Sequence, residues 1–299
     1  MMNSAATGES RMKQLDFIHR SHGRYWVGDG FPVQSVFSYR DIAAAMSPFL
    51  LLDYAAPTHF PPTQRKLGVG PHPHRGFETV TLVYEGGISH RDSMGGGGSI
   101  ATGDVQWMTA AAGLLHEEYH SREYARVGGP FEMIQLWVNL PARDKMMAPA
   151  YQSISAARIP QFAWPQQAGV ARIIAGELGG LRGPAQTKTP MNVWDLRLRA
   201  GQHFDIALND GDTTALFLLR GQISLHGQTV LAGELAVMQR SGDTLCFDTR
   251  EEEVHALLLS GAPIAEPIVA HGPFVMNTAA EIEQAMADYR NGRFGHLTS

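Results

Sequence analysis

The sequence predicts an all-β fold of two tandem antiparallel β-barrels followed by a short C-terminal helix. Short runs of β-branched and aliphatic residues recur along the chain and are separated by glycine-bearing turns, a pattern typical of barrels and sandwiches. An internal repeat relates the two halves of the chain. A single capped helical pattern lies near the C-terminal end. Together these observations favour tandem barrels over alternating βαβ units.

Four segments carry the strongest strand pattern, because β-branched and large apolar residues dominate each of them. They are Thr79–Tyr84, Phe131–Leu140, Val193–Leu198 and Thr213–Leu219.

The predicted helix begins at Thr278, because Thr278 and Glu281 have the spacing of a capping box. Apolar residues then recur at helical spacing, and Asn291-Gly292 supplies a stop signal. We expect this helix to pack against the body of the protein through Ile282, Ala285, Met286 and Tyr289.

Composition limits the class of protein. The chain has 299 residues, of which 44% are hydrophobic and 18% charged, and its net charge is −5. This acidic balance argues against a nucleic-acid surface, so no direct nucleic-acid partner is expected. The single cysteine, Cys246, excludes a disulfide framework and fits a reducing cytoplasm. No apolar stretch approaches the ~20 residues of a membrane span, and no signal peptide is recognisable, so we expect a cytoplasmic protein with no membrane contact.

The repeat defines the expected domains. Two blocks align: Tyr84–Ser89 with Leu219–Ser224, and Thr102–Met108 with Ala232–Met238, while Gly113 matches Gly242. We therefore expect a first barrel over residues 12–148, a second over 168–277, and a helix and tail over 278–299.

The first copy contains a longer loop, Arg91–Ser99, with four consecutive glycines. Because it lacks the Lys-Ser/Thr ending of a phosphate-binding loop, we interpret it as a flexible turn.

Two short patterns suggest a metal site. In a strand, residues two apart share a face, so His72 and His74 would present two imidazoles together, and His116 and Glu118 would form a second such pair. Pro73 lacks a backbone donor, which places the first pair at the start or edge of a strand. If the barrel brings both strands together, three nitrogens and one oxygen converge, a ligand set that suits iron, manganese, copper or nickel.

The repeat provides a control for this hypothesis. Counting from Gly221 and Gly242 gives the positions that correspond to the four candidates in the second copy. None of these positions holds a ligand: they are Ala207, Asn209, Leu245 and Phe247. We therefore expect a metal in the first barrel and none in the second.

An alternative interpretation exists, because His116–His120 matches the H-E-x-x-H pattern of zinc proteases. That site needs a helix through residues 110–121. Gly113 and the turn-like counterpart in the second copy oppose such a helix, and His72 and His74 would remain unexplained.

With these motifs the sequence resembles the pirins of the cupin superfamily, over about residues 24–295. The resemblance implies a bicupin of two jelly-roll-type barrels with one metal ion in the first. It implies Fe2+ as the ion, with Mn, Cu, Ni, Co or Zn as alternatives, and the ligands His72, His74, His116 and Glu118. The motifs that carry it are His72–Val80, Gly103–Ala110, Gly113–Glu118, Gln135–Pro141 and Gly272–Asn277.

Three further polar residues, Glu78, Arg75 and His120, are candidates for supporting the ligands. Glu78 occupies the position where many cupins have a carboxylate ligand, and its alternative role is an ion pair with Arg75. His120 either supports the site or lies on the surface. Phe77 and Trp107 either line an apolar pocket or belong to the core.

The resemblance also implies a function. Many bacterial pirins are similar in activity to quercetin 2,3-dioxygenases, which open a flavonol with O2 and release carbon monoxide. A small aromatic substrate and O2 are then expected, with Glu118 as metal ligand and general base. The alternative is an iron-containing, redox-sensing regulatory protein that binds a transcription factor or a metabolic enzyme.

Overall fold

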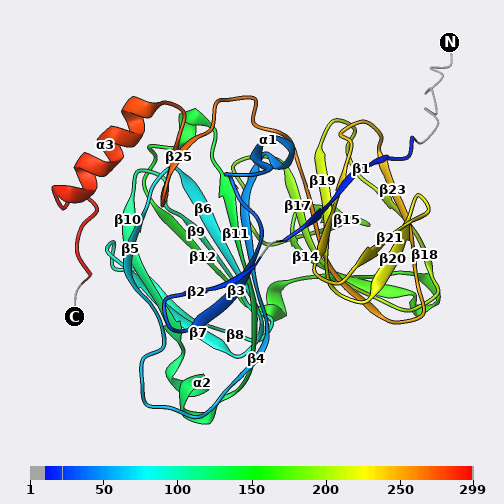
Figure 1. Cartoon of the computed structure of the whole chain (residues 1–299), viewed down its shortest axis with the longest axis horizontal. Helices are drawn as coiled ribbons and strands as arrows, with labels where there is room; N and C mark the ends of the chain where they lie inside the picture. Colours follow the sequence, from blue (N-terminus) through cyan, green and yellow to red (C-terminus); the bar gives the residue numbers. More distant parts are fainter. Residues whose placement is uncertain (1–10, 22, 298–299) are drawn as a thin grey trace.

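The computed structural model, which describes residues 11–21 and 23–297, contains two β-barrels side by side (Figure 1). In each barrel a seven-stranded sheet faces a four-stranded sheet. The first barrel has the strand orders β12-β9-β6-β11-β4-β3-β2 and β5-β10-β7-β8, and the second has β1-β22-β19-β24-β17-β14-β13 and β18-β23-β20-β21. The predicted fold class is confirmed.

The first barrel is built from eleven strands. They are β2 (Arg24–Val27), β3 (Phe31–Phe37), β4 (Phe49–Phe60), β5 (Gly68–His74), β6 (Phe77–Glu85), β7 (Gly87–Asp92), β8 (Gly97–Ala101), β9 (Val105–Thr109), β10 (Leu114–His120), β11 (Gly129–Asn139) and β12 (Ala150–Ile154).

The second barrel also has eleven strands. They are β1 (Leu15–Arg20), β13 (Gln161–Ala163), β14 (Gly169–Ala175), β17 (Met191–Leu198), β18 (His203–Ala207), β19 (Thr213–Arg220), β20 (Gln222–Leu225), β21 (Gln228–Leu231), β22 (Glu234–Met238), β23 (Thr244–Thr249) and β24 (Val254–Gly261).

Short elements complete the described chain. They are the ribbons β15 (Glu177–Leu178) with β16 (Leu181–Arg182) and β25 (Val269–His271) with β26 (Phe274–Met276), the helices α1 (Ala43–Met46), α2 (Arg122–Val127) and α3 (Ala279–Arg290), and the 3-10 turns η1 (Ala142–Asp144), η2 (Ala156–Arg158) and η3 (Pro165–Gln167). None of the described helices has the length and apolar character needed to cross a membrane.

All four predicted strand segments are confirmed, as β6, β11, β17 and β19. The repeat is visible in the structure as well. The hairpin β6–β7 corresponds to β19–β20, β9 corresponds to β22, and β10 corresponds to β23.

The main core lies where the two seven-stranded sheets face each other. Alternate residues of β11 such as Leu136 point into this core, together with Val80 of β6, and meet Phe217 and Leu257 of the second barrel; all four are fully buried. Because successive side chains of a strand point to opposite faces, the remaining residues of these strands face the interior of their own barrel. Because alternate residues are buried at the interface between the barrels, only the residues that face a barrel interior can form a site there.

A buried polar network also joins the barrels. Tyr54 of β4 donates a hydrogen bond to Glu132 of β11 (2.6 Å), and Arg220 of β19 forms an ion pair with the same carboxylate (2.5 Å). Arg220 also donates to Nδ1 of His255 (2.9 Å), whose Nε2 contacts the buried Asp195 (2.6 Å). Since Nδ1 accepts, Nε2 carries the proton that His255 donates to Asp195.

The structure places the two chain ends differently from the expected domain boundaries. Residues 15–20 fall within the span expected for the first barrel, but they form β1 and pair with β22 at the edge of the second. Residues 269–276 fall within the expected second barrel, but Phe274 bridges Arg75 of the first. Figure 1 shows β1 on the second barrel and α3 against the first. Added segments cover strand edges that would otherwise remain unpaired.

The C-terminal helix α3 has the predicted capping box, in which the Thr278 side chain accepts from the Glu281 amide and Glu281 accepts from the Thr278 amide. Ile282 and Ala285 are buried as expected. Tyr289 differs, since it is 42% exposed, and Asp288 is buried in its place.

The glycine-rich loop forms the turn of a β-hairpin between β7 and β8, so a turn is present as predicted, and Gly97 and Gly98 belong to β8. The Asp92 carboxylate accepts hydrogen bonds from the backbone amides of Met94 (2.7 Å) and Gly96 (3.0 Å). A side chain that satisfies turn amides in this way fixes the turn, which composition alone did not reveal.

The buried ion pairs predict how stability depends on pH. Burial by itself would raise the pKa of Asp195, but the His255 hydrogen bond and the nearby arginines outweigh it, so the pKa lies below 3.8. A lowered carboxyl pKa stabilises the fold above the unfolded-state pKa, and this contribution is lost as the pH falls through the folded-state pKa. We expect Asp195→Asn to lower the free energy of unfolding by about 3 kcal/mol at pH 7. Urea unfolding at pH 7, 5 and 3.5 should show the gap between the variant and the parent narrowing below about pH 4.

Asp248→Asn is the matched control, because Asp248 is an exposed carboxylate that pairs with an exposed histidine in the same barrel. It should change the free energy of unfolding by less than about 1 kcal/mol. A gap for Asp195→Asn that stays constant with pH would contradict this account.

Candidate metal centre

The pairing of β5 with β10 brings the predicted ligands together. The two strands run antiparallel, with His72 directly opposite His116 and His74 opposite Leu114. β5 is the edge strand of its sheet, as predicted from Pro73, whose missing amide hydrogen costs no ladder bond there. Two short motifs 42 positions apart therefore meet across one pair of strands.

Three imidazoles form a compact cluster. One nitrogen of each of His72, His74 and His116 can be chosen so that all three atoms lie within 4.8 Å of one another. The ring centroids are 4.2 Å apart for His72 and His116 and 4.8 Å apart for His74 and His116. Rings this close, on three different backbone positions, have the arrangement of ligands around one ion.

The protonation of these rings fits metal binding. Burial lowers the pKa of His72, and it lowers those of His74 and His116 well below the usual value, so all three are neutral near pH 7. Nδ1 of His72 lies 2.8 Å from the Gly70 carbonyl oxygen, which holds the proton on Nδ1 and leaves Nε2 with a lone pair. Both ring nitrogens of His116 are buried without a hydrogen-bond partner in the described chain. A metal ion would satisfy such nitrogens.

Glu118 faces the same cavity as His72 and His74. The pairing of β10 with β5 is irregular between His116 and Glu118, and a bulge of this kind re-aims side chains beside a site. Glu118 is 7% exposed, and its Oε1 has no partner among the described residues. Burial raises its pKa to about 7, although a hydrogen bond with Thr81 acts in the opposite direction. The compact 4.8 Å group consists of the three histidines, so Glu118 as fourth ligand stays a prediction.

The cavity beside the histidines has a volume of about 600 Å3. Its wall combines aliphatic and polar side chains with aromatic ones, among them Phe31 and the stacked pair Tyr39 and Trp137. Gly272 and Pro273 come from the C-terminal segment and close the cavity from outside the barrel. A cavity of this size and lining is typical of sites for small aromatic ligands.

The two aromatic residues considered from the sequence have different positions. Phe77 packs against His74, with ring centroids 5.1 Å apart. Trp107 is buried in the core between the barrels, so it does not line the cavity. Trp137 is the tryptophan at the site, and its alternation with the interface residues Leu136 and Val138 along β11 was the available signal.

A row of polar side chains crosses the interior of the seven-stranded sheet, and sequence reasoning missed it. Cross-strand pairing links five residues in register: Ser35, Asp53, Gln135, Thr81 and Gln106. Thr81 donates to the Gln135 side chain (2.6 Å), and Tyr25 donates to Oδ2 of Asp53 (2.6 Å).

Part of this row lines the cavity. Ser35, Asp53 and Gln135 face it together with the histidines. Asp53 is 6% exposed, and its Oδ1 lacks a hydrogen-bond partner within the described residues. A buried acceptor without a partner is costly unless a bound molecule supplies a donor.

Two of the three supporting candidates are turned away from the histidines. Glu78 lies opposite Val138 in the pairing of β6 with β11, which places it on the face that meets the second barrel. Its partner is the Thr109 hydroxyl (2.6 Å). Arg75 pairs with Asp288 of α3 (2.8 Å) and therefore anchors the C-terminal helix.

His120 is buried, so its interpretation as a surface residue was wrong. Its Nε2 lies 2.9 Å from the Gly30 carbonyl oxygen, and its ring stacks on Phe131 with centroids 4.8 Å apart. It packs into an aromatic cluster two residues beyond Glu118 on β10.

A histidine and a tyrosine form a further pair next to the cluster. His90 of β7 lies opposite Glu118 in register, so both face the barrel interior. Its ring stacks on Tyr151 at 4.6 Å between centroids, and the Tyr151 hydroxyl contacts the ring nitrogens. Burial lowers the pKa of His90 to about 4.

The helix required for an H-E-x-x-H protease is not formed. Residues 114–120 are strand β10, in which His116 and His120 are four residues apart along an extended chain. At about 3.4 Å per residue, the Cα atoms of such residues lie far beyond the spacing of one helical turn. The zinc-protease alternative is therefore excluded.

The second barrel has an apolar interior at the corresponding place. Leu245 pairs with Ile206, one residue before Ala207, the position obtained by counting. Ala207 itself is exposed. Phe204 and Phe247 stack with ring centroids 5.4 Å apart. Among the described residues of this barrel, no group of three possible metal ligands lies close enough together to hold an ion.

Comparison with known proteins agrees with this architecture. The pirin family model matches residues 30–138, and the model of the pirin C-terminal cupin domain matches residues 193–295. The chain belongs to the pirin family. It is 51% identical over 283 residues to a Pseudomonas aeruginosa protein named "Putative quercetin 2,3-dioxygenase PA2418", covering 95% of this chain and 99% of that protein.

Two further relatives of this pirin are informative. Human pirin is 35% identical over 259 residues, which cover 84% of this chain and 83% of human pirin. The crystal structure of a quercetin 2,3-dioxygenase from Acinetobacter baumannii superposes with a TM-score of 0.93 at 48% identity, covering 96% of this chain and all of that one.

The cluster predicts the effect of removing one ligand. His116→Ala deletes an imidazole with two unpartnered nitrogens, so metal retained after desalting should fall by at least about tenfold, measured by elemental analysis per protein chain. His203→Ala is the control, because His203 is exposed on β18, the strand of the second barrel that corresponds to β5. Full retention of metal by His116→Ala, or equal loss in both variants, would contradict the assignment.

Proposed function

We propose that this pirin is a mononuclear metal-dependent dioxygenase that opens flavonols such as quercetin with O2. One observation carries the proposal: His72, His74 and His116 have ring nitrogens within 4.8 Å of one another, beside a cavity of about 600 Å3. His74, His116 and Glu118 each have a buried side-chain atom without a hydrogen-bond partner among the described residues, and Glu118 borders the cavity together with His72 and His74. The names of the Pseudomonas and Acinetobacter relatives support the same reaction class.

His72, His74 and His116 would hold the metal through neutral imidazoles, and Glu118 would add a carboxylate oxygen. Three nitrogens and one oxygen suit iron(II), and manganese, cobalt, nickel, copper and zinc accept the same donors. When bound, the ion supplies Lewis acidity and a path for electrons between an electron-rich substrate and dioxygen.

Glu118 would take the proton from the flavonol hydroxyl. Its Oε1 is buried and has no hydrogen-bond partner among the described residues. A carboxylate in such surroundings holds a proton more strongly than in water, which suits it to deprotonating a weakly acidic hydroxyl. Excluding water also protects the ring-opening step from hydrolysis.

The cavity wall suits a flat molecule with several hydroxyl groups. Trp137 and Tyr39 provide aromatic faces, while Asp53 and Gln135 provide polar groups along one side. The Oδ1 atom of Asp53 would accept a hydrogen bond from a substrate hydroxyl. Aromatic surface with a few placed polar groups both binds and orients such a ligand.

The reaction predicts flavonol-dependent oxygen uptake with release of carbon monoxide. In Glu118→Gln the base is lost, and uptake measured with an oxygen electrode on quercetin should fall by at least about 100-fold. Glu78→Gln is the matched control, because Glu78 is also buried with one unpartnered oxygen but faces the other barrel. This control should retain activity within about threefold. Loss of activity in Glu78→Gln but not in Glu118→Gln would indicate that Glu78, and not Glu118, is the base.

A metal-loaded protein that consumes no oxygen with quercetin or any other flavonol tested would contradict the proposed reaction. Such a result would favour the alternative function, a redox-sensing regulatory protein.

The unpartnered Oδ1 of Asp53 at the cavity predicts how the protein discriminates between flavonols. Because a hydrogen bond to a charged acceptor contributes about 1.5–3 kcal/mol, Asp53→Asn should raise KM for quercetin by about tenfold or more. For 3-hydroxyflavone, which lacks the additional hydroxyls, KM should change by less than about twofold. Steady-state oxygen uptake with both substrates provides the measurement. An equal change for both would indicate that Asp53 only maintains the fold around Tyr25.

A further inference from the structure

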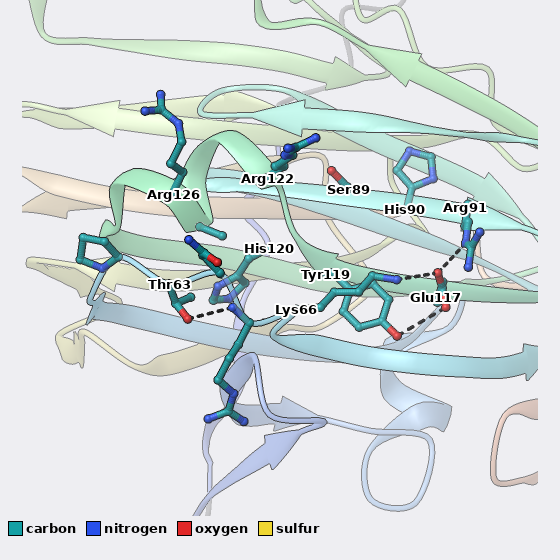
Figure 2. Close-up of a pocket in the computed structure, with 14 residues that line it drawn as sticks. Thr63, Lys66, Ser89, His90, Arg91, Glu117, Tyr119, His120, Arg122 and Arg126 are labelled. Atoms are coloured by element: carbon teal, nitrogen blue, oxygen red, sulfur yellow. Dashed lines mark hydrogen bonds and ion pairs between the residues drawn. The ribbon is translucent and has the colours of Figure 1, made fainter. Parts of the chain in front are cut away.

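A second cavity, of about 1030 Å3, lies on the outer side of the four-stranded sheet of the first barrel. Its walls are residues 62–66, the strands β7 and β10, and helix α2 (Figure 2). Glu117 and Tyr119 of β10 border it, and these residues alternate along the strand with His116 and Glu118, which face the interior. The two cavities therefore lie on opposite faces of the same strand.

The charge of this outer cavity differs in sign from that of the protein. The chain as a whole has a net charge of −5, but only one acidic residue, Glu117, is among the fourteen that line the cavity. Five of the fourteen are cationic: Arg65, Lys66, Arg91, Arg122 and Arg126. A concave site with several like charges focuses the field on an oppositely charged ligand.

Part of this charge is already compensated. Glu117 forms ion pairs with Lys66 (3.1 Å) and Arg91 (2.5 Å), and Arg65 pairs at the rim with Asp29 (3.4 Å). Figure 2 shows the contacts of Glu117 on one side of the cavity.

The two arginines of α2 have no such partner. Within residues 11–21 and 23–297, no carboxylate lies within 4.0 Å of the guanidinium of Arg122 or Arg126. Figure 2 shows both side chains leaving the same short helix. Two exposed, uncompensated guanidinium groups thus remain at the cavity.

The two arginines lie close together on one short helix. Arg122 is the first residue of the six-residue helix α2. Arg126 lies four residues later, so the two like charges are neighbours on one face. A bound anion would relieve the repulsion between these two guanidinium groups.

The cavity wall is held in place without a ligand. The Thr63 amide donates to the Ala125 carbonyl (2.7 Å), which ties residues 62–66 to α2, and the Ser121 side chain caps the helix by accepting from the Tyr124 amide (3.2 Å). Lys66 lies over the Tyr119 ring, 3.7 Å from its centroid. A cavity wall that is already fixed loses little conformational freedom when a ligand binds.

We propose that this outer cavity is a binding site for a small polyanion that carries two or more phosphate groups. The planar guanidinium forks of Arg122 and Arg126 match phosphate oxygens. On the other side of the cavity, Lys66 and Arg91 are two cations that share the one carboxylate of Glu117, and they would bind a second group. An extended acidic peptide fits less well, because β7 and β10 are internal strands of their sheet and offer no free edge for backbone pairing.

The test is calorimetric titration of the full-length metal-loaded protein with tripolyphosphate. We expect one molecule bound per chain and an affinity that falls as salt is added. The double variant Arg122→Gln/Arg126→Gln should bind at least tenfold more weakly. Arg143→Gln/Arg182→Gln is the matched control, since it removes two exposed arginines outside the cavity, and it should bind within twofold of the parent.

Two further arms identify the ligand class and the site. Hexaglutamate should bind at least tenfold more weakly than tripolyphosphate, and equal affinity would replace the proposal with an acidic-peptide site. Because polyphosphates also chelate metals, His116→Ala is titrated as well; unchanged binding supports the outer cavity, and lost binding assigns the ligand to the metal. Equal weakening in both arginine double variants, or no binding to the parent at millimolar concentration, would overturn the proposal.

A folding defect is separable from a binding defect. Removing the like-charge pair should leave the Tm of Arg122→Gln/Arg126→Gln unchanged or higher. If Tm falls, Arg122→Lys/Arg126→Lys provides the second measurement, because it retains both charges and loses the planar forks. That variant should still bind more weakly than the parent, and full affinity would exclude bidentate recognition by these arginines.

Discussion

The antiparallel pairing of β5 with β10 is the contact on which both candidate sites depend. It sets His72 opposite His116 and therefore assembles the imidazole cluster on the inner face. The same strand presents Glu117 on its outer face, where it meets Lys66 and Arg91. Since a register shift of one residue would exchange the two faces of β10, one hydrogen-bond register determines the metal centre and the basic cavity together.

The two faces of each seven-stranded sheet have different roles. One face of each sheet is apolar and packs against the other barrel, so the interior faces are free to differ. In the first barrel the interior holds a polar row that includes Asp53 and Gln135, together with the histidines. In the second barrel the corresponding space is filled by Phe204 and Phe247. The apolar filling stabilises one copy, and the polar interior of the other leaves unpartnered groups that a metal and a ligand would satisfy.

The exchange of terminal segments joins the barrels into one unit. β1 completes the edge of the second barrel, while the segment with Gly272 and Pro273 closes the cavity of the first. Arg75 follows the ligand strand β5 and binds Asp288 of α3 across 2.8 Å. The chain end therefore contributes to the site by position, although it contributes no ligand to the histidine cluster.

The sequence by itself determined the fold class, the repeat and the histidines that cluster, because strand alternation and repeat comparison are local properties of the chain. It also specified the cap of α3, since Thr278 and Glu281 interact across only three residues. Only the tertiary structure decided which face each buried residue occupies, so it separated Glu118 at the cavity from Glu78 at the barrel interface. It also decided the role of residues distant in sequence, such as Asp53, Trp137 and the chain ends. Their positions follow from cross-strand register and from packing between barrels, and these long-range contacts leave no local pattern in a single sequence.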